Sequence, residues 1–188
     1  MSVDLEAQIR ESSDAIAACA ALLPTLMRAA EVCIAALRSG GTVAWCGNGG
    51  SASQAQHFAA ELVGRFRRER QAFSSISFTT DSSILTAIGN DYGFDQVFSR
   101  QVDGLLRPGD VLIGLSTSGG AANVCLAMEA AHSIAVNTIG FTGQDGGKVG
   151  PLCDIELRVA ADMTARIQEC HLLLGHLLCD LIEAAMVE

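Results

Sequence analysis

Two pairs of side chains in this sequence have the types and spacings that proton-transfer or metal chemistry requires. His57 and Glu61 are four residues apart, so on a helix they project from one face, one turn from each other. That spacing can bring an imidazole nitrogen and a carboxylate to one metal ion, or set a base beside a ligand. Because His–Glu pairs are also common on ordinary helix surfaces, the spacing alone does not distinguish these uses.

Gln168 and His176 form a second pair near the C-terminus. On a helix, this spacing separates them by roughly 80° in azimuth and about 12 Å along the axis. They therefore share a broad face without being neighbours, and both reach one centre only by leaning toward a point between them. One of the two is therefore expected to bind a metal loosely, and His176, which has a proton-transfer role to fill, is the candidate for the less fixed ligand. His171 falls on a different face and is interpreted as a structural residue.

Glu61 and His176 have side chains of the right chemical type to move protons beside a carbonyl group. Such a reaction needs a base of suitable pKa and an acid on the neighbouring oxygen. A divalent ion close to them would stabilise the negative charge that develops on an enediolate. These residue types are therefore compatible with an isomerisation that proceeds by proton transfer.

Two loops rich in glycine and hydroxyl groups are candidates for binding a small phosphate. One is CGNGGSAS at 46–53, and the other is STSGG at 116–120. Each follows an apolar run and precedes a helical one, so glycine can admit an anion to the N–H groups of a helix N-terminus. Ordinary tight turns have a similar composition, but two such loops in equivalent places favour a ligand site. The sequence lacks G-x-x-x-x-G-K-[ST] and a complete G-x-G-x-x-G, which argues against a nucleotide.

Alternating apolar and helical segments must position these groups. Residues 5–38 are expected to be helical, with Pro24 as the break between two helices, and their excess of apolar residues predicts packing against another subunit. Helices are further expected at 53–66, from a cap at Asp81 to Ile88, up to Ala131, and at 164–186. Strands are expected at 42–46, 74–78, 110–115, 135–141 and 155–159. This order predicts βαβ units and a mostly parallel sheet that is covered on both faces.

Composition and charge exclude several classes of protein. The 188 residues are 49% hydrophobic with a formal net charge of −9, which suits one compact domain, 1–188, and argues against a nucleic-acid partner. The seven cysteines lie mostly among Ala, Leu and Val, as is typical of reduced, buried thiols in a cytoplasmic protein. The polar N-terminus and the lack of an apolar run of roughly 18 residues argue against a signal peptide and a membrane span. The basic run is interpreted as a solvated helix end, with only the first residue as an exception: Arg65, Arg67, Arg68 and Arg70.

Several motifs together resemble the phosphoheptose isomerases (sedoheptulose 7-phosphate isomerases) of the sugar isomerase, or SIS, superfamily. They are CGNGGSASQAQHFAAELVGRF, GNDYGF, LSTSGGAANV, TGQDGGK and TARIQECH, and the resemblance runs from the region of Ala30 to the C-terminus. It implies a three-layer αβα sandwich with a five-stranded parallel sheet and N-terminal helices, assembled as a homotetramer with active sites between subunits. It also implies isomerisation of sedoheptulose 7-phosphate to D-glycero-D-manno-heptose 7-phosphate through an enediol, for bacterial surface heptose synthesis.

The resemblance also implies roles for particular residues. One zinc ion per subunit would be bound by His57, Glu61, Gln168 and His176, with Glu61 as general base and His176 as general acid. Where the family usually has a further phosphate-contacting serine this chain has Ala121, so one hydrogen bond to phosphate is expected to be missing. The positions expected to contact substrate are Asn48, Gly49, Gly50, Ser51, Glu61, Arg65, Asn90, Asp91, Ser116, Thr117, Ser118 and Gln168.

Other functions fit parts of this pattern. A non-catalytic SIS-fold adaptor that binds the bacterial replication initiator keeps much of the GNG…AQHFA stretch, but it typically lacks the glutamate that Glu61 provides here. Another SIS enzyme could act on a hexose or pentose phosphate, because function is set by the site and not by the fold. A ligand-sensing domain of a transcriptional regulator is disfavoured, since no helix-turn-helix segment accompanies the SIS pattern.

Overall fold

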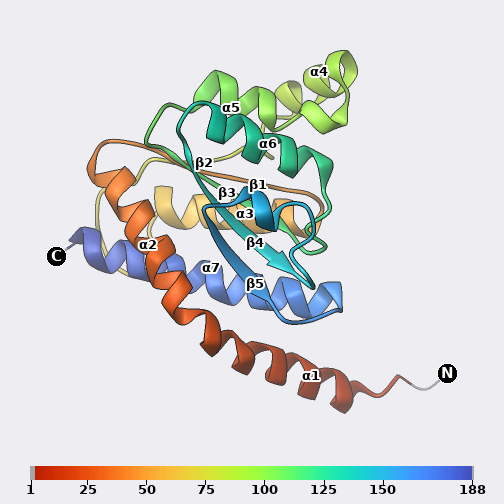
Figure 1. Cartoon of the computed structure of the whole chain (residues 1–188). Helices are drawn as coiled ribbons and strands as arrows, with labels where there is room; N and C mark the ends of the chain where they lie inside the picture. The colour runs from red at the N-terminus through yellow and green to blue at the C-terminus, as the bar shows by residue number, and fades with distance from the viewer. Residues whose placement is uncertain (1–2, 188) are drawn as a thin grey trace.

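A parallel sheet between two layers of helices forms the centre of the computed structural model, which describes residues 3–187 (Figure 1). Every residue of the central strands β1 and β3 is buried, as expected for strands that are covered on both faces. All strands pair in parallel, in the order β2-β1-β3-β4-β5. Their bounds are β1 Val43–Gly47, β2 Ser75–Ser77, β3 Val111–Ser116, β4 Asn137–Gly143 and β5 Ile155–Val159.

The helices divide between the two faces of this sheet (Figure 1). On one side lie α2 (Leu23–Arg38), α3 (Gly50–Val63) and α7 (Thr164–Val187), with α1 (Leu5–Ala18) packed on α7. On the other side lie α4 (Ser82–Tyr92), α5 (Ser99–Leu105) and α6 (Ala122–Ser133). Short 3-10 helices complete the chain at Cys19–Leu22, Phe94–Gln96 and Gly150–Leu152. The predicted three-layer αβα sandwich with N-terminal helices is confirmed.

Alternate residues of the central strands fill two separate cores. Trp45, Ile113 and Phe141 belong to the core shared with α2, α3 and α7, whereas Ala44 and Leu112 belong to the core shared with α5 and α6. Successive side chains of a strand point to opposite faces, so filling both cores requires near-continuous apolar strands. This requirement explains why the central strands β1 and β3 are near-continuous apolar runs in the sequence.

Several boundaries differ from those expected. The first helical region breaks at the 3-10 turn Cys19–Leu22, and Pro24 lies in the first turn of α2, where a helix does not need its N–H. Helix α3 begins and ends earlier than predicted, and α5 was not predicted at all. The predicted cap of α4 is confirmed, because Asp81 accepts a hydrogen bond from the backbone N–H of Ile84 at 2.9 Å.

The strand order places the loops after β1 and β3 side by side. From β1 the chain continues to β2 on one side of the sheet, and from β3 it continues to β4 on the other, so the order reverses between β1 and β3. In open parallel sheets, ligands bind beyond the carboxyl ends of the strands at such a reversal. Both loops that were predicted to hold phosphate lie at this point.

Two helical stretches are long and apolar enough, by length and composition, to cross a membrane. Leu5–Arg38 and Thr164–Val187 each contain an 18-residue window with a mean hydropathy of 1.6. The expectation that no such run exists is therefore wrong. The finding is weak evidence for a membrane span, because core helices pass the same test, and α7 supplies Leu174, Leu178 and Ile182 to the core.

All seven cysteines are free thiols, and all except the half-buried Cys153 are buried. Burial raises the pKa of Cys33 to about 12, so this side chain stays protonated at neutral pH. The interpretation of the cysteines as small buried residues is confirmed for the six that are buried.

Candidate active site

His57, Glu61 and His176 come together where α3 packs against α7. The Nε2 atoms of the two histidines are 2.8 Å apart, and Nε2 of His57 lies 3.3 Å from Oε1 of Glu61. One potential ligand atom from each residue lies within 4.8 Å of those from the other two. Two imidazole nitrogens and a carboxylate oxygen form a donor set that suits zinc, so these positions fit a metal ion.

Aromatic rings restrain His176 on several sides. The ring of Phe66 stacks on it at 5.5 Å between centroids, and Phe58 meets it edge-on at 6.0 Å. The side chain of His57, by contrast, is 45% exposed. Burial and the neighbouring His57 lower the pKa of His176, an effect that Glu61 opposes, which favours a neutral ring at neutral pH. These contacts argue against the expectation that His176 is the less fixed ligand.

Gly175 allows α7 to approach α3 closely enough for His176 to reach His57. A Cβ atom at this position would lie 2.1 Å from Cζ of Phe58, whose ring is fully buried and packs against Trp45. A side chain here would have to displace this buried ring, so glycine is favoured at this position. Glycine inside a helix is unfavourable, and its presence in the middle of α7 was a signal of this contact that the sequence analysis did not use.

We expect Gly175→Ala to destabilise the protein, although alanine is the better helix former. The gain in helix propensity is about 1 kcal/mol, whereas overpacking a filled core typically costs about 1–3 kcal/mol and sometimes more. Urea unfolding measures the difference, with Gly104→Ala in α5 as the control, because a Cβ there would meet no described atom within 4 Å. A Gly175→Ala protein that is as stable as the wild type would contradict this account.

Gln168 lies toward the other end of the α3–α7 contact. Its side chain lies next to Gly50, where a Cβ atom would come within 2.5 Å of Gln168 Nε2. The backbone carbonyl of Gln168 accepts a 2.7 Å hydrogen bond from Nε2 of Gln54. From Gly50 to His57, α3 rises by about 10 Å. The structure therefore places Gln168 beside the first loop and away from the two imidazoles, and its role as a metal ligand remains a prediction.

A pair of amide side chains joins the first candidate phosphate loop to the helix that follows the second. Asn48 of the first loop and Asn123 of α6 exchange hydrogen bonds of 2.8 and 2.9 Å. Asn123 is buried, and this pairing fixes the first loop relative to the helix that follows the second loop. Asn123 belongs to the LSTSGGAANV motif, but its role could not be predicted, because a contact across 75 residues of chain leaves no local pattern.

The second loop is hydrogen-bonded to the glycine-rich segment at 142–149. Gly119 has a φ of +62°, and its carbonyl accepts hydrogen bonds from the N–H groups of Lys148 and Val149 at 2.8 and 2.9 Å. Oγ of Ser118 accepts a 3.2 Å hydrogen bond from the N–H of Gly120. The loops thus collect, at one end of the sheet, the predicted positions Asn48, Gly49, Gly50, Ser51, Ser116, Thr117 and Ser118.

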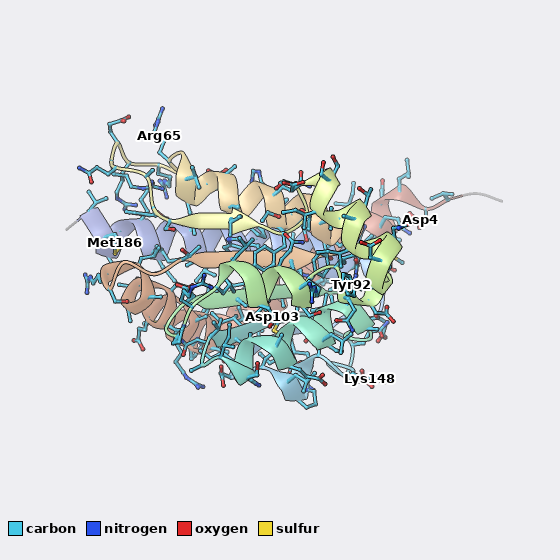
Figure 2. All side chains as sticks on the ribbon, turned by 90° about the horizontal axis from the view of Figure 1, so that it is seen from above. Asp4, Arg65, Tyr92, Asp103, Lys148 and Met186 are labelled. Atoms are coloured by element: carbon cyan, nitrogen blue, oxygen red, sulfur yellow. The ribbon has the colours of Figure 1, made fainter. Side chains whose placement is uncertain are left out.

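The remaining predicted substrate residues are not gathered at these loops. Arg65 is largely exposed and lies 3.5 Å from Glu69, just beyond the end of α3. Asn90 and Asp91 are exposed on α4, where the Asn90 amide donates a 2.8 Å hydrogen bond to Asp91. Figure 2 shows Arg65 and Tyr92, the last residue of α4, at opposite ends of the molecule. One subunit therefore does not bring Arg65 and Asp91 into a single site.

His171 has the surroundings of a structural histidine, in line with its predicted role. It is fully buried, and its Nε2 donates to the carbonyl of Thr142 at 2.9 Å, since a carbonyl can only accept. Nδ1 meets no hydrogen-bond partner among the described residues. Burial lowers the pKa of His171 to about 4, against the effect of the Thr142 hydrogen bond, so the ring is neutral at physiological pH.

The basic run after α3 is not the solvated helix end that was predicted. Helix α3 ends at Val63, and the side chain of Arg70 is only 4% exposed, because it pairs with the buried Glu183 at 3.1 Å. Arg67 and Arg68 both pair with Asp180 at the surface. The solvated interpretation is therefore wrong for Arg70, whose charge is compensated inside the protein.

Sequence and fold are both similar to those of known SIS-domain proteins. The SIS domain family matches residues 5–143. A phosphoheptose isomerase of Rhodospirillum rubrum is 54% identical over 163 residues, or 87% of each chain, and one of Akkermansia muciniphila is 45% identical over 183 residues, or 97% of each chain. The solved phosphoheptose isomerase of Neisseria gonorrhoeae, 47% identical, matches the fold with a TM-score of 0.91 over 96% of this chain and 97% of that one. Together with the hydroxyl-rich loops and the His–Glu–His cluster, these similarities show that the chain belongs to the phosphoheptose isomerases of the SIS-domain family.

Proposed function

We propose that this enzyme is an aldose–ketose isomerase that converts sedoheptulose 7-phosphate to D-glycero-D-manno-heptose 7-phosphate through an enediol, for bacterial surface heptose synthesis. The observation that carries the proposal is the position of Glu61, a carboxylate set beside His57 and His176 on facing helices. Identities of 45–54% to phosphoheptose isomerases over most of the chain support the same substrate. A non-catalytic adaptor would have no need of this glutamate.

The reaction needs two proton transfers, which we assign to two side chains. A proton must leave C1 of the ketose and one must arrive at C2, while O2 gains the hydrogen that O1 loses. We assign the transfer between carbons to the carboxylate of Glu61 and the transfer between oxygens to the imidazole of His176. A divalent ion held by His57, Glu61 and His176 would supply positive charge where the two oxygens become negative.

For the metal we propose zinc, one ion per subunit. The ligand atoms available from His57, Glu61 and His176 are two nitrogens and an oxygen, which zinc accepts in four-coordinate sites. Gln168, whose side chain contacts Gly50 in this structure, remains the candidate for a further ligand.

The phosphate group of the substrate is assigned to the two loops at the carboxyl ends of β1 and β3. Ser51, Ser116, Thr117 and Ser118 offer hydroxyl groups there, and the N-terminus of α3 offers the positive end of the helix dipole. About 10 Å of α3 lie between this region and His57. An extended sugar phosphate can span that distance, with its phosphate at the loops and its reacting carbons beside Glu61.

Restoring the family's serine at position 121 should strengthen substrate binding. Ala121 is the N-cap residue of α6 and makes no side-chain capping bond. In Ala121→Ser, the new hydroxyl should lower KM roughly 10- to 100-fold, because a hydrogen bond to a charged group contributes about 1.5–3 kcal/mol. Capping of α6 by the same hydroxyl should add about 1 kcal/mol of stability. Steady-state kinetics with the heptose phosphate measure the first effect, and thermal unfolding the second. An unchanged KM would contradict the expectation that Ala121 costs the enzyme a hydrogen bond to the phosphate.

We further propose that the subunits assemble as a homotetramer through the N-terminal segment 1–38 and α7. Leu5 and Ile9 of α1 are 69% and 66% exposed, which is unusual for large apolar side chains in a packed helix. An apolar groove of about 300 Å³ lies between α2 and α7, lined by Leu23, Met27 and Leu181 among others. Subunit packing would also allow Arg65, Asn90 and Asp91 to contribute to the active site of a neighbouring subunit. Light scattering after size-exclusion chromatography measures the assembly.

The whole chain, 1–188, is taken as one domain that works in the cytoplasm on a phosphosugar, without nucleic-acid or membrane partners. The decisive experiment incubates purified protein with sedoheptulose 7-phosphate, with and without zinc, and follows the aldose product. No turnover under either condition would favour the adaptor function, and turnover of a pentose or hexose phosphate alone would change the substrate.

A further inference from the structure

One buried carboxylate fastens the segment that follows α3 to α7. Glu183 is fully buried and accepts hydrogen bonds from the backbone N–H groups of Phe66, Arg67 and Arg68, at 2.9, 2.8 and 2.8 Å. Its Oε1 also lies 3.1 Å from Nε of Arg70. Burial alone would raise the pKa of Glu183, but the three N–H groups and Arg70 lower it, so this carboxylate is charged.

Arg70 connects that carboxylate to the C-terminal end of α3. Its Nη2 donates to the carbonyl of Glu61 at 2.9 Å, and its Nη1 donates to the carbonyls of Leu62 and Gly64 at 2.9 and 3.0 Å. The last carbonyls of a helix have no partner within the helix, and a cation is favourable beside them. Arg70 and Glu183 therefore hold the last turn of α3, which carries Glu61, against α7.

Phe66 extends this restraint into the active site. Its N–H is bound to Glu183, and its ring stacks on His176 at 5.5 Å with only 24° between the planes. His176 and Glu183 lie two turns apart on the same face of α7. A segment bound to Glu183 is thus placed to cover His176.

We propose that Glu183 and Arg70 are positioning residues for the isomerisation, because their ion pair holds Phe66 against His176 and keeps Glu61 in place relative to it. This inference rests on the proposed function of Glu61 and His176. A buried ion pair is often no more stabilising than apolar residues of similar volume. Its use at this position is better explained by the single arrangement of the 64–71 segment that it specifies.

Substitutions of Glu183 and of Phe66, separately and together, test this proposal. In Glu183→Gln, an amide NH₂ group replaces one of the two oxygens that accept hydrogen bonds from the backbone N–H groups. We expect kcat to fall roughly 10- to 100-fold, which is the effect of losing an outer partner of a metal ligand. KM should change little. Phe66→Leu should lower kcat similarly, whereas Phe66→Tyr keeps the stacked ring and should retain activity. If Glu183 acts through Phe66, the double variant Glu183→Gln with Phe66→Leu should lose little more than either single variant.

Asp110→Asn is the matched control. Asp110 is also a buried carboxylate that accepts backbone N–H groups, from Thr42 and Arg107 at 2.8 Å each, but these partners precede β1 and follow α5 and belong to neither α3 nor α7. Its loss should lower the urea midpoint without changing kcat. Binding of Co²⁺, followed by its visible absorption, supplies a readout that does not need turnover, and Glu183→Gln should weaken it by a factor similar to the loss in kcat.

Distinct outcomes separate the possible failures. A Glu183→Gln enzyme with a lower urea midpoint but wild-type kcat and Co²⁺ affinity would overturn the positioning role. If that variant does not fold, Phe66→Leu and Phe66→Tyr decide, because the ring takes no part in the ion pair, and equal kcat values for the two would also overturn it. A wild-type protein without heptose-phosphate turnover counts against the proposed function, and the Co²⁺ affinities of the variants then decide the positioning role.

Discussion

Glu61→Gln should lose most of the turnover of sedoheptulose 7-phosphate while it keeps the fold. The amide has the size of the carboxylate but cannot accept a proton, and a well-placed general base contributes typically 10²- to 10⁴-fold to a rate. That range corresponds to roughly 3–5 kcal/mol of activation free energy. Because Glu61 lies on the side of α3 that faces His176, the fold should not depend on its charge. The measurement is kcat from the rate of aldose formation.

The variant must be separated from a simple loss of metal, since Glu61 is also a proposed ligand. Glutamine keeps an oxygen that can bind zinc, so the zinc content should be measured beside kcat in the same preparation. Exchange of the C1 hydrogen with D₂O, followed by NMR, isolates proton removal from the rest of the reaction and should be as slow as turnover. Glu31→Gln, an exposed glutamate of α2, is the control and should behave as wild type. Substantial turnover by zinc-loaded Glu61→Gln would eliminate the assignment as base.

The central strands β1 and β3 were predictable from the sequence because a parallel strand covered on both faces must be apolar at nearly every position. The start of α3 was placed too late for an equally physical reason. Gly50 and Ser51 are poor helix formers, yet they lie inside the helix, because the loop turns at Gly49 with a φ of +55°. Helix α5, Ser99–Leu105, is short and has no side-chain cap, so it left no periodic pattern to recognise.

Local spacing predicted half of the active site, and tertiary packing determines the rest. The pairing of His57 with Glu61 follows from one turn of α3. Whether Gln168 or His176 meets that pair depends on how α7 crosses α3, and the contact of Gly175 with Phe58 fixes that crossing. The Arg70–Glu183 pair joins residues 113 positions apart, and neither side chain has a neighbour in sequence that signals the other. Such contacts cannot be derived from one sequence by periodicity.

His57→Ala and His176→Ala should each lose the proposed metal and, with it, turnover. Each variant removes one of three ligand atoms that lie within 4.8 Å of one another. Loss of an outer partner of a ligand already weakens metal binding roughly 10- to 100-fold, so loss of the ligand itself should weaken it further. Zinc content after purification and competition with a chromophoric chelator are the measurements. His132→Ala, which removes an exposed histidine of α6 paired with Asp154, is the control and should keep wild-type zinc.

Added zinc should restore turnover to different extents in the two variants, because the two imidazole rings have different surroundings. His176 is held by Phe66 and Phe58, so its removal takes away both a preorganised ligand and the proposed acid, and saturating zinc should not restore turnover. His57 is half exposed and has no proposed role in proton transfer, so His57→Ala should recover part of its activity at high zinc. Equal rescue of both would show that His176 acts only as a ligand. Full turnover by wild-type protein stripped of zinc would show that the cluster works through its side chains alone, which would leave Glu61 and His176 as the catalytic pair without a metal.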